Sequence, residues 1–207
     1  MVNNPQVPAG QPFTPNVVHL ERRLFHMAGS SICPVLALFV QRDLVVTLLL
    51  GATVLFVVGD VVRLLVGRLN RLFHRLFRQL LRKAEESRIT GASYMLLGTV
   101  GAFVLFSKDV AILAVFFAAL GDPIAAMIGI RVPGKRVFGK SLLGTMAMIA
   151  VALGVAGILH VTAGIGVRWP VVVGAMVAGI VELLPLPLDD NLRVPIVAGT
   201  AMTFLGM

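Results

Sequence analysis

Seven apolar segments constrain the fold of this chain more than any other feature. Each holds roughly 16 to 23 mostly hydrophobic residues, and about 17 to 25 such residues cross the hydrocarbon layer of a bilayer as a helix. Overall, 57% of the residues are hydrophobic and 14% are charged, against about 45–50% and 25% in a soluble domain. A water-soluble fold and a disordered chain are therefore excluded. The expected spans are residues 24–40, 44–66, 91–107, 110–130, 141–161, 170–187 and 191–206.

Two polar regions flank or interrupt these spans. Residues 1–20 are rich in Pro and Asn, and we expect a polar tail without a removable signal peptide, followed by a single membrane domain over 21–207. Residues 68–88 carry Leu and Phe every three or four positions with Arg between them, which predicts a basic amphipathic helix. Such a helix lies in the bilayer interface against anionic lipid head groups, or packs on the protein's own cytoplasmic surface. The expected fold is thus an all-α integral membrane protein with about seven transmembrane helices and one basic interfacial helix.

The distribution of basic residues predicts the orientation. The chain has 18 Lys and Arg against 10 Asp and Glu, a net charge of +8. Seven spans would place 15 of the 18 on the N-terminal side and leave Arg42, Lys108 and Arg168 on the other. Because basic loops stay in the cytoplasm, we expect a multi-pass protein with a cytoplasmic N-terminus. The positive charge is then mainly an orientation signal, and nucleic acid is not an expected partner.

Acidic residues inside or beside the spans need a reason, because a charge in the hydrocarbon layer is costly. Asp60, Asp122, Glu182 and the adjacent pair Asp189 and Asp190 all fall in the expected cytoplasmic half. Asp122 lies in a Gly-Asp-Pro sequence, where we expect the proline to break the helix. Carboxylates that face Lys and Arg across a water-accessible cleft suit a magnesium-bound polyphosphate.

The alternative is that these charges form structural ion pairs. Asp60 and Arg63 are three residues apart, so they share a helix face and can pair. For these two residues both interpretations remain open. The neighbouring carboxylates of Asp189 and Asp190 favour a bound cation, because they repel each other without one.

Residues 134–141 match the phosphate-loop pattern, with Lys140 and Ser141 at its end. A membrane span precedes the loop instead of a strand, so a soluble nucleotide-binding fold is rejected. The local physics still suits a phosphate: glycines permit close backbone approach, Lys140 supplies charge, and Ser141 would begin a helix whose amide groups attract anions. The alternative is a basic loop that serves topology alone.

Six groups of residues occur in a fixed order along the chain. They are Glu21 to His26 with Gly29, Asp60 with Arg63, Arg88 with residues 90–94, Gly121 to Pro123 with Ala125, Ala126 and Gly129, Gly134 and Lys135 with Gly139 to Ser141 and Gly144, and Glu182 with Asp189 to Leu192 and Pro195. This ordered set resembles the CTP-dependent lipid kinases, a family that includes dolichol kinase, phytol and farnesol kinases and the CTP-using diacylglycerol kinase of fungi. The resemblance implies transfer of the γ-phosphate of CTP to a membrane lipid alcohol with a divalent metal such as Mg²⁺.

The resemblance, together with the charges, gives a set of expected roles at a cytoplasmic active site. Catalysis is expected of Asp122, Lys140 and Asp190. The nucleotide would be bound by Lys135, Arg136, Gly139, Lys140, Ser141 and Asn191. Mg²⁺ would be held by Asp122, Glu182, Asp189 and Asp190, and one aspartate could instead accept the proton of the lipid hydroxyl. A supporting rim is expected from Glu21, Arg22, His26, Asp60 and Arg63.

Two other functions remain open at this point. A cytidylyltransferase would use the same nucleotide and metal but would form a CDP-lipid. A small transporter would use the interrupted span and the intramembrane acids to bind a cation or substrate. Nothing in the sequence separates phytol, a polyprenol such as dolichol, and diacylglycerol as the acceptor. Small residues such as Gly174, Ala178 and Gly179 would also permit close helix packing in a homo-oligomer.

Overall fold

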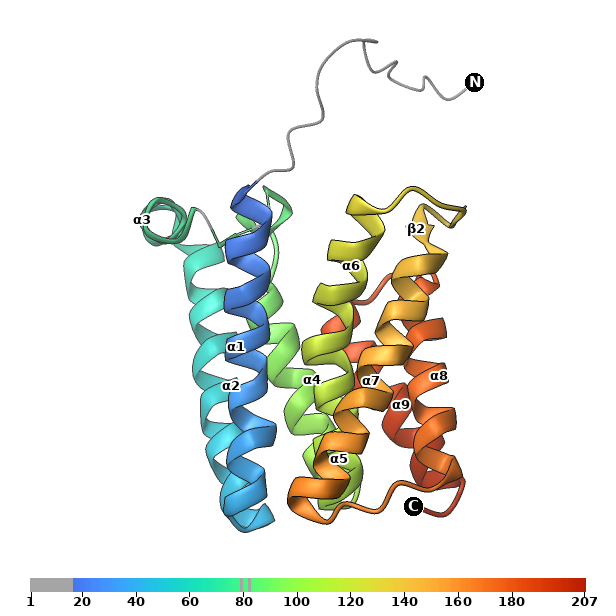
Figure 1. Cartoon of the computed structure of the whole chain (residues 1–207). Coiled ribbons are helices and arrows are strands. Elements are labelled where there is room, and N and C mark those ends of the chain that lie inside the picture. The colour runs from blue at the N-terminus through green and yellow to red at the C-terminus, as the bar shows by residue number, and fades with distance from the viewer. Residues whose placement is uncertain (1–16, 79, 82) are drawn as a thin grey trace.

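The computed structural model describes residues 17–78, 80–81 and 83–207, which form a bundle of helices (Figure 1). Its elements are α1 (Val17–Phe39), α2 (Arg42–Leu65), α3 (Gly67–Phe77), the 3₁₀ turn η1 (Lys83–Glu86), α4 (Gly91–Leu105), α5 (Lys108–Phe116), the π-helical turn η2 (Phe117–Gly121), α6 (Asp122–Arg131), β1 (Arg136–Val137), β2 (Lys140–Ser141), α7 (Leu142–Ala163), α8 (Trp169–Leu183) and α9 (Asp190–Phe204).

The long helices run along one common direction, and every expected span overlaps one of them (Figure 1). Within the described part of the chain, three helices are long and apolar enough to cross a membrane: Arg42–Leu65, Lys108–Arg131 and Leu142–Ala163. Two shorter apolar helices, Gly91–Leu105 and Trp169–Leu183, accompany them. This is the architecture expected of an all-α membrane protein.

The core of the bundle is built around α5. All residues from Val110 to Phe116 on this helix are buried. In the most apolar 18-residue stretch of Lys108–Arg131, 67% of the residues are buried, whereas the corresponding stretch of α2 is 22% buried. The outer position of α2 leaves many of its apolar side chains exposed, among them Leu48, Val54 and Leu55. A surface of this composition suits contact with acyl chains.

The helix containing Asp122 differs from the expectation, because it is not broken. Residues Lys108–Arg131 form one continuous helix, in which η2 ends at Gly121, directly before Asp122 and Pro123. A π-helical turn changes the hydrogen-bonding pattern locally, so the missing N–H of proline is accommodated without interrupting the helix.

The structure differs from the expected elements in three further ways. The expected helix over 68–88 is shorter, since α3 ends at Phe77 and a separate 3₁₀ turn covers Lys83–Glu86; residues 79 and 82 lie outside the described residues. Helix α1 begins at Val17, so part of the expected tail is helical, and residues 1–16 also lie outside the described residues. Among the described residues, a hairpin of two-residue strands accompanies the helices.

Candidate active site

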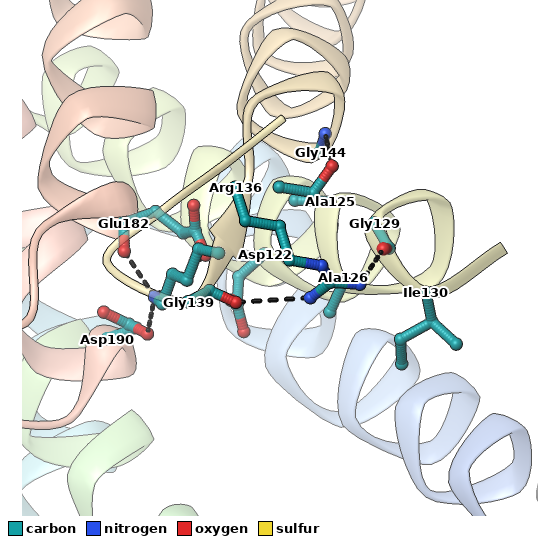
Figure 2. Close-up of a pocket in the computed structure, with 12 residues that line it drawn as sticks. Asp122, Ala125, Ala126, Gly129, Ile130, Arg136, Gly139, Gly144, Glu182 and Asp190 are labelled. Atoms are coloured by element: carbon teal, nitrogen blue, oxygen red, sulfur yellow. Dashed lines mark hydrogen bonds and ion pairs between the residues drawn. The ribbon is translucent and has the colours of Figure 1, made fainter. Parts of the chain in front are cut away.

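A pocket of about 230 Å³ lies where α6, the β1–β2 hairpin and the adjoining ends of α7, α8 and α9 meet (Figure 2). We call this end of the bundle the hairpin end. The lining residues are Asp122, Ala125, Ala126, Gly129 and Ile130 from α6, Arg136, Gly139, Lys140 and Ser141 from the hairpin, Gly144 from α7, Glu182 from α8 and Asp190 from α9.

The hairpin places Lys140 and Ser141 at the start of α7. Its two turn residues, Phe138 and Gly139, both have positive φ values, 52° and 83°, as two-residue hairpin loops of type I′ require. Val137 then pairs with Lys140 and Arg136 with Ser141. Ser141 caps α7 by accepting a hydrogen bond from the Gly144 amide at 3.4 Å. The expectation that Ser141 begins a helix is confirmed.

Close contact between two helices holds the hairpin against α6. A Cβ atom added at Gly144 would lie 2.6 Å from the carbonyl oxygen of Ala125, so only glycine permits this approach. The Arg136 guanidinium spans the same contact by donating to the carbonyl oxygens of Gly139 at 3.2 Å and Gly129 at 3.1 Å (Figure 2). The phosphate-loop-like segment is therefore fixed to the helix that carries Asp122.

Three carboxylates from three helices converge in this pocket. Asp122, Glu182 and Asp190 each offer an oxygen within 4.8 Å of the others, and Figure 2 shows their side chains approaching from α6, α8 and the start of α9. The Lys140 ammonium lies 2.9 Å from Glu182 Oε1 and 3.0 Å from Asp190 Oδ2, and it also donates to the Glu182 carbonyl oxygen. The structure thus brings together the main catalytic residues expected from the sequence.

The surroundings of Lys140 keep its side chain charged. Burial opposes the charged form, but the hydrogen bond to Glu182 and the negative charge of Asp190 outweigh burial and raise the pKa of Lys140 above its ordinary value. Lysine is already protonated at neutral pH, so the raised pKa adds no titration there. The pocket therefore keeps a permanent cation beside its carboxylates.

Arg193 is a member of this site that sequence analysis did not assign to it. Its guanidinium pairs with Asp190 Oδ1 and donates to the Leu184 carbonyl oxygen at 3.2 Å, while the whole residue is only 8% exposed. Asp190 consequently lies between two cations, Lys140 and Arg193. The three-residue spacing of Asp190 and Arg193 at the start of a helix was a usable signal, because such residues face the same side.

Other expected site residues lie outside the pocket lining. Asp189 caps α9 by accepting from the Asn191 backbone and side-chain nitrogens at 3.0 and 2.7 Å. Lys135 is exposed, and its carbonyl oxygen accepts from the Leu142 amide. The expected rim residues Glu21, Arg22 and His26 belong to α1, and the pocket lining includes none of these three.

Asp60 and Arg63 pair with each other inside a separate polar cluster. The Asp60 carboxylate accepts from Arg63 Nε at 2.7 Å, from both the amide and the hydroxyl of Thr90 at 2.8 Å, and from the Ser93 hydroxyl at 2.6 Å. Arg63 also donates to the Asn70 side chain and to the carbonyl oxygens of residues 85 and 88. This group, here called the Asp60 cluster, joins α2, α3 and the start of α4, which favours the structural interpretation of the pair.

The carboxylate set fits a divalent metal in its chemistry. Mg²⁺ prefers hard oxygen ligands at about 2.1 Å, so two of its ligands lie at most about 4.2 Å apart. Oxygens within 4.8 Å of one another reach this spacing with small side-chain movements. Asp122, Glu182 and Asp190 are therefore the residues that would hold the ion.

Comparison with known proteins identifies similarity to an uncharacterised protein and to two kinases. An uncharacterised protein of Rickettsia prowazekii is 26% identical over 182 residues, which cover 85% of this chain and 89% of that protein. CTP-dependent diacylglycerol kinase 1 of Saccharomyces cerevisiae is 30% identical over 141 residues, covering 65% of this chain and 48% of the kinase. The enzyme of the same name from Eremothecium gossypii is 30% identical over 145 residues, covering 64% and 43%.

The chain spans just under half the length of the two kinases that it matches. No family model and no solved structure matches it. The chain that forms this pocket of three carboxylates and a lysine is thus similar in sequence to two proteins named CTP-dependent diacylglycerol kinase 1.

Proposed function

We propose that this chain is a lipid kinase that transfers the γ-phosphate of CTP to the hydroxyl group of a membrane lipid alcohol at the cytoplasmic face. The convergence of Asp122, Glu182 and Asp190 around Lys140 is the observation that carries the proposal. Phosphoryl transfer depends mainly on positioning and on neutralising charge. The similarity to two CTP-dependent diacylglycerol kinases supports the donor and the class of acceptor.

The cationic side of the pocket suits the triphosphate. Lys140 lies in the lining with Arg136, beside backbone amides near Gly139 and at the N-terminus of α7. A helix N-terminus attracts anions because the helix dipole is positive at that end. Lys135 and Asn191, which lie just outside the lining, complete the proposed nucleotide site.

The carboxylates divide two tasks between them. Asp122, Glu182 and Asp190, with Asp189 close behind, would hold Mg²⁺, which would supply positive charge to neutralise the phosphates. Asp122 or Asp190 accepts the proton of the lipid hydroxyl while that oxygen bonds to the γ-phosphorus and CDP leaves. Arg136 and Lys140 hold the phosphate chain during this transfer.

The acceptor would reach the site along α6. The pocket lining combines the carboxylates with Ala125, Ala126 and Ile130, and Ile130 is exposed at the surface of the bundle. A lipid alcohol has the matching arrangement of an apolar chain and a single polar end. Its hydroxyl would therefore lie at the carboxylates while its chain remains against apolar helices; phytol, a polyprenol and diacylglycerol all meet this requirement.

The test is transfer of label from [γ-³²P]CTP to a panel of lipid alcohols by the purified protein in detergent. Asp122→Asn and Lys140→Ala should each lower transfer at least about 100-fold, because each removes a charge that acts on the transferring group. Asp109→Asn and Lys108→Ala are matched controls at the opposite end of the bundle and should leave the rate unchanged. Undiminished transfer by both site variants would exclude this site, and no transfer to any alcohol would exclude the function.

A label on the α-phosphate separates the kinase from a cytidylyltransferase. The kinase leaves this label in CDP, whereas a cytidylyltransferase moves it into the lipid. The continuous course of Lys108–Arg131 removes the broken helix on which the transporter hypothesis depended. Uptake of a solute by proteoliposomes without nucleotide turnover would nevertheless favour a transporter.

A further inference from the structure

Helix α3 is unlike the other helices in direction and in surface. It runs across the axes of α1 and α2 at the hairpin end, where Figure 1 shows it end-on. The helix and the residue after it carry Arg68, Arg71, Arg75 and Arg78. None of its residues is fully buried, so most of its surface faces away from the rest of the protein.

The Asp60 cluster fixes one side of α3. Arg63 Nη1 donates to Asn70 Oδ1 at 2.8 Å, and the Asn70 amide donates to the carbonyl oxygen of residue 86 at 2.8 Å. The Arg63 guanidinium also lies 4.9 Å from the centre of the Phe73 ring. Asn70 and Phe73 are three positions apart and share a helix face, so this face is anchored and the rotation of α3 about its axis is set.

Two exposed rows follow from that rotation. At about 100° per residue, Leu69, Leu72 and Leu76 form one row next to the anchored face. The four arginines form a second row, beside the leucines and on the side away from the Asp60 cluster. The leucines are 44%, 50% and 67% exposed, and all four arginines are exposed as well.

The arginine row has no partner of its own within the described part of the chain. No hydrogen bond or ion pair there involves the side chains of Arg68, Arg71, Arg75 or Arg78. Four adjacent cations beside three exposed leucines match the surface of an anionic bilayer, where phosphates lie directly above acyl chains.

We infer that α3 is a docking surface for anionic phospholipids: the leucine row enters the acyl layer and the arginine row binds the phosphates of neighbouring head groups. The occupant is the bilayer, because α3 lies across the direction of the long helices (Figure 1). If the long helices cross the bilayer, α3 runs parallel to its surface, and both rows of side chains follow that surface. This inference concerns a surface formed by α3 and not the pocket, so it stands whether or not the protein uses CTP.

Lipid selection by the purified protein tests the arginine row. The protein is equilibrated in mixed micelles with equal amounts of phosphatidylcholine and phosphatidylglycerol, and the phospholipid that stays bound is identified by mass spectrometry. The wild-type protein should be enriched in phosphatidylglycerol. Each arginine near an anionic surface contributes about fivefold to its attraction, so the double substitution Arg71→Gln with Arg75→Gln should reduce the enrichment about tenfold or more, and high salt should have a similar effect.

Two control variants make this result specific. Lys108→Gln with Arg168→Gln removes the same charge at the opposite end and should leave the enrichment unchanged. Arg71→Lys with Arg75→Lys keeps the charge and should keep the enrichment. An unchanged enrichment in the Arg71 and Arg75 glutamine variant, or an equal loss in the opposite-end control, would overturn the inference.

A fluorescence measurement tests the leucine row. Trp169, the one tryptophan of the chain, is replaced by Phe and a new one introduced by Leu72→Trp. Brominated acyl chains should quench its emission in nanodiscs that contain phosphatidylglycerol. An unquenched, water-exposed emission would contradict the inference, as would a protein dimer that dissociates on changing Leu69, Leu72 and Leu76 to Ser, because the row would then cover a second copy of the chain.

Discussion

At the scale of single residues, the candidate site is organised by the charges around Asp190. This carboxylate pairs with Lys140 on one oxygen and with Arg193 on the other. Lys140 in turn contacts Glu182, so a continuous line of alternating charges runs from α9 through the hairpin to α8. A carboxylate held from both sides has little rotational freedom, and its position relative to Asp122 depends on both cations.

We expect Arg193→Gln to lower kcat about 10-fold or more while KM for CTP changes little. The reason is that Arg193 positions Asp190 and does not line the pocket itself. Loss of a hydrogen bond to a charged group should also reduce the free energy of unfolding by about 2 kcal/mol. Steady-state kinetics at varied CTP, with a thermal melt, measure both effects.

The conservative variant Arg193→Lys should recover part of kcat, because it restores the charge but not the two-pronged guanidinium. Arg168→Gln, at the opposite end, is the control and should match the wild-type protein. A raised KM for CTP at constant kcat would mean that Arg193 binds the nucleotide directly.

At the scale of elements, the α6–α7 contact determines where Asp122 and Lys140 lie relative to each other. We expect Gly144→Ala to destabilise the fold by about 1–3 kcal/mol and to lower kinase activity, because the new methyl group would meet the Ala125 carbonyl oxygen at 2.6 Å. Gly154→Ala is a matched control on the same helix, with nothing within 4 Å of the added Cβ. It should be neutral or slightly stabilising, since alanine favours helix more than glycine. Equal melting temperatures of the two variants would contradict a tight α6–α7 contact.

The elements also show how far the sequence could be interpreted. The length of the apolar segments located the long helices, because an apolar run of about 17–25 residues has few stable conformations other than a membrane-spanning helix. The continuous helix through Pro123 could not be foreseen, since the π-helical turn before it depends on packing around residues 117–121. Glu182 and Asp122 are 60 positions apart in the chain, so their meeting is a tertiary contact that no spacing rule predicts.

The role of Asp60 and Arg63 could also be interpreted only with the fold in hand. Their spacing indicated a possible pair, but it left open whether they served the phosphate site. Their partners Asn70, Thr90 and Ser93 come from two other helices and a loop. Only their assembly shows that the pair is saturated by structural hydrogen bonds.

At the scale of the whole molecule, the candidate site, α3 and the start of α1 share the hairpin end, while the chain finishes at the other end (Figure 1). The distribution of basic residues predicts that the hairpin end is cytoplasmic. In a Cys33→Ala background, Val132→Cys should therefore react with a membrane-impermeant maleimide only after cells are permeabilised. Val167→Cys, at the opposite end, should react in intact cells. Both valines are exposed, at 42% and 38%, and the reverse labelling pattern would place the candidate site outside the cytoplasm.

The Asp60 cluster has a consequence for the order of assembly during synthesis. Asp60 and Arg63 are each only 4% exposed, yet the groups that satisfy them are all later in the chain, with Ser93 33 positions after Asp60. Asp60 and Arg63 can therefore gain their full set of hydrogen bonds only after α3 and the first turn of α4 have been synthesised. An α2 that is followed by no further chain would leave these two polar groups incompletely paired, which is unfavourable wherever water is absent.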